Sequence, residues 1–123
     1  MNKTQILMMF AINPFDKEED SLFSNKHIMT SKELVNQTWA FAKEVLKTYV
    51  PKDTPVCIGT KAVTGNGARV VVALKGKNEG YACTVYSISK RLRIIEEICN
   101  MFENGLAVLS PEDLEIATEG EER

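Results

Sequence analysis

The residues best placed for chemistry are three basic side chains at the start of a predicted helix. Lys90, Arg91 and Arg93 follow directly after an apolar strand pattern. A helix start presents unpaired backbone N–H groups that attract anions, whereas cations placed there oppose the helix dipole. A phosphate ligand would make that arrangement favourable, and Arg69 in the neighbouring hairpin is a further candidate ligand. The alternative is that these cations lie on a solvated helix face or pair with acidic residues farther along the chain.

A second group of charged residues lies in the long polar segment 15–29. Its acidic members are Asp16, Glu18, Glu19 and Asp20. The cluster lacks the glycine and the terminal glutamate of a calcium-binding loop, so we expect no metal there. Long connections without secondary structure are often functional, and we treat this one as a candidate interaction loop.

The motifs of catalysis and cofactor binding are missing. His27 is the only histidine, and the three cysteines Cys57, Cys83 and Cys99 fall inside apolar patterns without a Cys-x-x-Cys pair. We therefore predict buried thiols in a reducing cytosol, with no disulfide and no zinc site. The glycines of segment 65–67 match neither a dinucleotide fingerprint nor a phosphate-binding loop. The prediction is a protein without enzymatic activity and without a cofactor.

The clearest structural element is a helix over residues 30–49. Thr30 and Glu33 form a capping-box pattern, apolar residues recur at helical spacing, and Pro51 closes the segment. Trp39 and Tyr49 lie on the apolar stripe, so both are expected in the core. A second amphipathic helix is predicted over 89–104, ending at Asn-Gly.

Three strands between these helices form a predicted antiparallel meander. They cover 56–63, 68–74 and 81–88, and Asn66-Gly67 is a strong hairpin signal. Tyr81 and Tyr86 are separated by an odd number of positions, so they point to opposite sheet faces. One of them is expected to be exposed, and Tyr86 is retained as a candidate interaction residue.

The remaining apolar segments complete the predicted topology. Continuous runs at 6–12 and 106–109 are expected to be strands, the first of them buried on both faces, although periodicity also allows a short buried helix at 6–12. Ser110-Pro111 is typical of a helix start, and the helix that follows is short. Residues 119–123 form an acidic tail that is expected to fray.

The expected fold is α+β, with elements in the order β-α-β-β-β-α-β. Residues 1–118 form a single domain, in which two amphipathic helices cover one face of a mostly antiparallel sheet of four or five strands.

The chain has 123 residues, 44% of them apolar, and a formal net charge of −2. That charge is too mild to indicate a nucleic-acid binder. No apolar run approaches the ~20 residues of a membrane span, and we expect a cytoplasmic protein.

One segment resembles a known family. Asp113-Leu114-Glu115-Ile116-Ala117-Thr118, followed by further acids, looks like the tail of a small anti-CRISPR protein family from Listeria prophages that inhibits Cas9. The match covers about one-twentieth of the 123 residues, and the overall size is similar. The resemblance implies a phage-borne inhibitor that binds a host defence protein, and it transfers no functional residue.

Two functions are therefore predicted. The first is a small regulatory module that binds a protein partner, with a homodimer through an unpaired sheet edge or through a helix face as one form of such binding. The second is a module that binds a nucleotide or another phosphate through the basic helix start. An enzyme with cysteine or carboxylate chemistry ranks third.

Overall fold

A five-stranded antiparallel sheet forms the centre of the protein in the computed structural model, which describes residues 2–10, 29–89 and 91–123. The strands are β1 (Val56–Val63), β2 (Gly67–Leu74), β3 (Glu79–Tyr86), β4 (Ala107–Val108) and β5 (Glu121–Glu122). The helices are α1 (Lys3–Met9), α2 (Ser31–Tyr49), α3 (Arg91–Glu103) and α4 (Pro111–Thr118). The strand order is β4-β3-β2-β1-β5, so the predicted meander forms the middle of the sheet.

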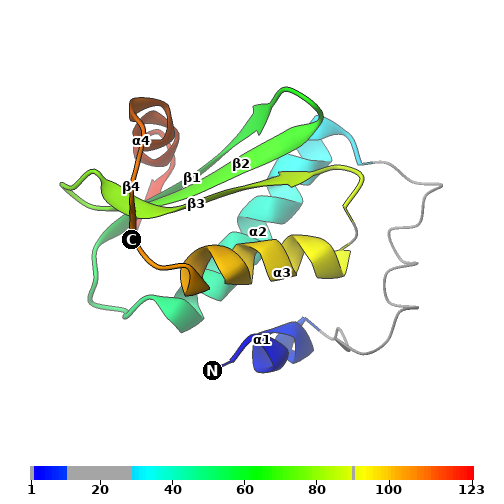
Figure 1. The fold of residues 1–123 in the computed structure, drawn as a ribbon, viewed down its shortest axis with the longest axis horizontal. Coiled ribbons are helices and arrows are strands. Elements are labelled where there is room, and N and C mark those ends of the chain that lie inside the picture. Colours follow the sequence, from blue (N-terminus) through cyan, green and yellow to red (C-terminus); the bar gives the residue numbers. More distant parts are fainter. Residues whose placement is uncertain (1, 11–28, 90) are drawn as a thin grey trace.

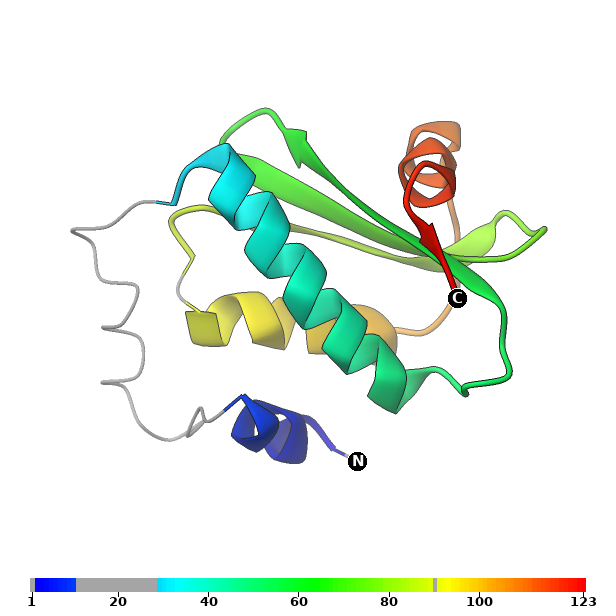
Figure 2. The ribbon, with the colours of Figure 1, turned by 180° about the vertical axis from the view of Figure 1, so that it is seen from behind.

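The two faces of the sheet carry different helices (Figures 1 and 2). On one face, alternate residues such as Ile58, Val70 and Val85 belong to a large core with α1, α2 and α3. On the other face, Cys57, Val71 and Ala73 form a smaller core with α4. This alternation follows from the two-residue period of a strand, which sends successive side chains to opposite faces. The predicted α+β class and the two helices on one face are confirmed.

α2 begins where the sequence predicts. The Thr30 hydroxyl accepts a hydrogen bond from the Glu33 N–H at 3.2 Å and donates to Glu33 Oε1 at 3.0 Å. Leu34, Val45 and Leu46 are buried from this helix. Trp39 is only half-buried, because it lies at the margin of the helix-covered face.

The first meander hairpin turns through three residues, because Val63 pairs with Gly67. Gly65 and Asn66 have positive φ angles of 81° and 58°. These are the residue types that adopt the left-handed region most readily. The predicted hairpin is confirmed, with Asn66 in the turn and Gly67 already in β2.

The prediction of a strand over 6–12 is wrong in its described part, because Lys3–Met9 is helical. Asn2 and Gln5 form a reciprocal capping box, in which each backbone N–H donates to the other side chain at 2.8 and 2.9 Å. Ile6 and Leu7 are buried against the core, whereas Met8 and Met9 are exposed. The apolar run therefore belongs to a short helix, which buries Ile6 and Leu7 and packs against α3.

The acidic tail, expected to fray, pairs with β1 through Cys57–Glu122 and Ile58–Glu121. Lys75 Nζ lies 2.9 Å from Glu122 Oε2, and the backbone N–H of Arg123 donates to the Val56 carbonyl at 2.8 Å.

No helix in the described part of the chain is both long and apolar enough to cross a membrane.

Candidate protein-interaction site

Arg69 lies on the α4 face of the sheet, away from the start of α3. Its Nε and Nη2 donate to the two carboxylate oxygens of Asp113 at 3.0 and 2.8 Å, and its Nη1 donates to Thr84 Oγ1 at 3.0 Å. Hydrogen bonding to Asp113 raises the pKa of Arg69 above its usual value. The guanidinium thus joins the sheet to α4, and its donors are directed to protein acceptors rather than to a ligand.

The two described cations at the start of α3 also contact protein groups. Arg91 Nη2 donates to the Phe10 carbonyl at 2.8 Å, and its guanidinium carbon lies 6.0 Å from the centre of the Phe41 ring. Arg93 Nε lies 3.5 Å from Glu97 Oε1, one helical turn away. Lys90 lies outside the described residues. The structure therefore does not bring Arg69, Arg91 and Arg93 together around one anion.

The predicted acidic loop, with Asp16, Glu18, Glu19 and Asp20, lies outside the described residues, as does His27. Within residues 2–10, 29–89 and 91–123, no group of three or more histidine, cysteine or acidic side chains has the geometry of a metal site.

The three cysteines are free thiols in or beside the core. Burial raises the pKa of the Cys83 thiol to about 12 and that of Cys99 to about 11. Because the thiolate is the nucleophilic form, burial disfavours nucleophilic chemistry by either thiol at neutral pH. This geometry favours a packing role for Cys83 and Cys99.

The two strand tyrosines point to opposite faces, as predicted. Tyr81 packs in the main core, with its ring centre 4.9 Å from that of Phe102. Tyr86 is 45% exposed at the end of β3 on the other face. Its ring lies over the hairpin, where a Cβ on Gly67 would come within 3.2 Å of Tyr86 Cε1. Tyr86 is thus a surface aromatic residue whose ring occupies space that the missing side chain of Gly67 leaves open.

Beside Tyr86, the outer edge of β3 pairs with no other described strand over most of its length. β4 pairs only with Glu79 and Gly80. The Leu109 N–H donates to the Asn78 carbonyl, and the Ser87 N–H donates to the Asn66 carbonyl in the hairpin turn leading into β2. Because backbone groups alternate in direction along a strand, those of Ala82 and Thr84 point to the open edge.

A hollow of about 250 Å³ lies between this edge and the first turns of α3. Its lining brings together two predicted site residues, Tyr86 and Arg93, with Thr84, Val85, Ser89 and Glu97. Small-molecule sites usually span roughly 300–1,000 Å³, so this hollow fits a protruding side chain better than a nucleotide. Ile88, which is 79% exposed, lies in the sequence between the lining residues Tyr86 and Ser89.

The other end of the same edge is also apolar. Leu106 and Val108, in and beside β4, are exposed, so large apolar side chains lie at both ends of the open stretch. Exposed apolar groups next to unpaired backbone are typical of a surface that binds another chain.

Tyr86 could be found by strand periodicity. Ile88, Thr84 and the open edge could not, because strand pairing is absent from local sequence patterns.

Comparisons with known proteins give no match, since no family model fits the chain and neither a curated protein nor a solved structure is significantly similar to it. The resemblance of residues 113–118 to an anti-CRISPR family stays a prediction. In this structure the segment forms most of α4, and Ala117 is buried against the sheet.

Proposed function

We propose that this protein is a small non-enzymatic module that binds a protein partner along the open edge of β3. The observation that carries the proposal is the exposure of Tyr86 and Ile88 beside the outward backbone groups of Ala82 and Thr84, which pair with no strand in residues 2–10, 29–89 and 91–123. An edge of this kind offers main-chain hydrogen bonds to an incoming strand, and neighbouring side chains supply specificity.

The side chains at this edge suit a protein partner. A tyrosine provides a rigid apolar ring with a polar end, which is why tyrosine is enriched where binding energy is concentrated. Burying an exposed isoleucine side chain contributes roughly 1.5–3 kcal/mol. The hollow beside Arg93 and Glu97 offers both charges to a partner side chain.

The proposal is tested with a photo-crosslinking amino acid at position 88, introduced into the full chain and activated in cells of the source organism. We expect one dominant adduct that loses most of its yield in Tyr86→Ala and in Ala82→Pro. The proline removes an N–H that points to the open edge and leaves the ladder to β2 intact.

The matched control places the same crosslinker at Glu112, which is exposed on α4. Equal adducts from positions 88 and 112, or none from position 88, would count against the proposal. An adduct of twice the chain's mass would identify the partner as a second copy.

A further inference from the structure

The opposite edge of the sheet is also partly open. Among the described residues, β1 pairs on this side only through Cys57 and Ile58 with β5, which Gly120 joins to the end of α4. The Arg123 N–H donates to the Val56 carbonyl, whereas the Lys75 N–H donates to the Pro55 carbonyl. By the same alternation, the N–H and C=O groups of Thr60 and Ala62 point to the open edge.

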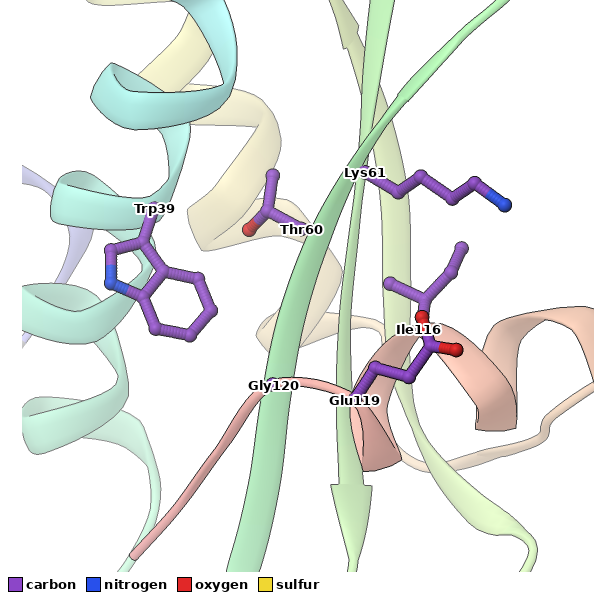
Figure 3. Close-up of a pocket in the computed structure, with 6 residues that line it drawn as sticks. All are labelled: Trp39, Thr60, Lys61, Ile116, Glu119 and Gly120. Carbon is purple, nitrogen blue, oxygen red and sulfur yellow. The ribbon is translucent and has the colours of Figure 1, made fainter. Parts of the chain in front are cut away.

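Side chains from both helical layers flank this edge (Figure 3). Trp39 of α2 lies on one side of β1 and Ile116 of α4 on the other, while Glu119 and Gly120 are at the end nearest β5. They enclose a groove of about 260 Å³. That volume is below the usual range for small-molecule sites and suits one or two side chains of a peptide.

Thr60 supplies an independent indication of a ligand. Its Oγ1 is buried and has no hydrogen-bond partner among the described residues. A buried hydroxyl without a partner is uncommon, because leaving it unpaired carries a desolvation cost. In Figure 3 the hydroxyl points to the Trp39 side of the groove. A peptide group or polar side chain entering there would complete its hydrogen bonding.

The charges along β1 indicate the kind of peptide. β5 brings Glu121 to 3.7 Å from Lys43 Nζ and Glu122 to 2.9 Å from Lys75 Nζ. Lys61, the next lysine along this edge, is exposed and has no carboxylate partner in the described ranges. An acidic residue in a strand continuing the line of β5 would pair with Lys61 in the same manner.

We propose that the open part of β1, from Thr60 to Val63, binds an extended acidic segment of a partner protein as an added strand beside β5. The intramolecular pairing of β5 with β1 provides the pattern for this interaction. Since β1 and β3 face opposite edges of the sheet, the proposal is independent of binding at β3.

The test is an NMR titration of the isotopically labelled full chain with two synthetic peptides. One alternates glutamate with valine, and the other replaces each glutamate with lysine. With the acidic peptide we expect shifts at Thr60–Val63 and at the Trp39 indole N–H, together with slower hydrogen exchange at Thr60 and Ala62. The lysine peptide is expected to bind about tenfold more weakly, because its charged residues meet Lys61 with like charge.

Two variants separate backbone pairing from charge. Ala62→Pro removes an outward N–H and should abolish the shifts, whereas the matched control Ala62→Val retains the donor and should bind like the unchanged chain. Lys61→Glu, a surface change, should weaken the acidic peptide by about fivefold. Equal binding of both peptides, no shift at millimolar peptide, or a response confined to Ala82–Tyr86 would overturn this proposal, and the last would still support binding at β3.

Discussion

Arg69 and Asp113 join the middle of the sheet to α4 through two parallel hydrogen bonds of 3.0 and 2.8 Å. Their side chains are 30% and 14% exposed, so the pair is partly shielded from water. The bidentate geometry is the strongest form of this ion pair.

Removing one partner of this pair should destabilise the fold. We expect Arg69→Met or Asp113→Asn to lower the free energy of unfolding by about 2 kcal/mol, the scale of a charge-assisted hydrogen bond. Urea denaturation measures the change. The double variant should lose less than the sum of the single variants, because each single change leaves the other group unpaired. Additive losses would show that the two side chains do not interact energetically.

The backbone of α4 lies directly against Gly59 of β1. A Cβ at this position would come within 1.8 Å of the Ile116 carbonyl oxygen, so α4 has to move if the residue becomes alanine. We expect Gly59→Ala to lower the free energy of unfolding by about 1–3 kcal/mol, as overpacking does. Lys61→Ala, an exposed change in the same strand, is the control and should leave the thermal midpoint nearly unchanged. Equal midpoints for Gly59→Ala and the unchanged chain would contradict this contact.

The buried thiols predict a loss of stability at alkaline pH. Burial raises the pKa of Cys99 from 9.0 to about 11, so in that interval the unfolded chain loses this proton while the folded chain retains it. The free energy of unfolding should therefore fall as the pH rises from about 9 to 11. Cys99→Ala should show a shallower fall in urea midpoint than the unchanged chain over this range. If the urea midpoints of the unchanged chain and of Cys99→Ala fell equally with pH, deprotonation of Cys99 would not be coupled to unfolding.

Arg91 holds α1 at the start of α3 through the Phe10 carbonyl. We expect Arg91→Gln to speed hydrogen exchange in α1, at Ile6 and Leu7, while exchange in β2 stays unchanged. The stability lost should be about 1–2 kcal/mol, since a charged donor is removed. Arg93→Gln is the control, because its exposed pair with Glu97 contributes only a few tenths of a kcal/mol. Equal exchange in both variants would show that Arg91 does not anchor α1.

The elements with strong local signals were predictable from the sequence. The Thr30–Glu33 cap and the apolar stripe gave α2 its correct start, and the turn around Asn66 gave the first hairpin. The strand predicted over 81–88 extends instead over Glu79–Tyr86, and the helix predicted over 89–104 covers Arg91–Glu103. These boundaries depend on the hydrogen bonds of individual residues, such as Ser89 N–H to the Tyr86 carbonyl, which side-chain periodicity does not encode.

The N-terminal helix was not predictable from apolar periodicity. A run of seven apolar residues fits a buried strand or a short helix equally well. The signal that decides is the spacing of Asn2 and Gln5, whose side chains cap the first turn.

The candidate site was predictable only in part. The odd spacing of Tyr81 and Tyr86 predicted that one of them is exposed, and the structure shows that this residue is Tyr86. The ion pair of Arg69 with Asp113 could not be predicted. The two residues are 44 positions apart and meet only when α4 packs on the sheet. The pairing of the acidic tail with β1 depends in the same way on contacts between distant parts of the chain.

The docking of α1 on α3 has a consequence for the order of folding. Lys3 Nζ and Asn100 Oδ1, 2.8 Å apart, are separated by 97 positions, whereas β1, β2 and β3 are joined by short turns. Contacts between distant positions close large loops at an entropic cost, so local hairpins form more readily. We expect the meander to assemble first and α1 to attach late, which makes α1 the first helix to detach when the native protein opens.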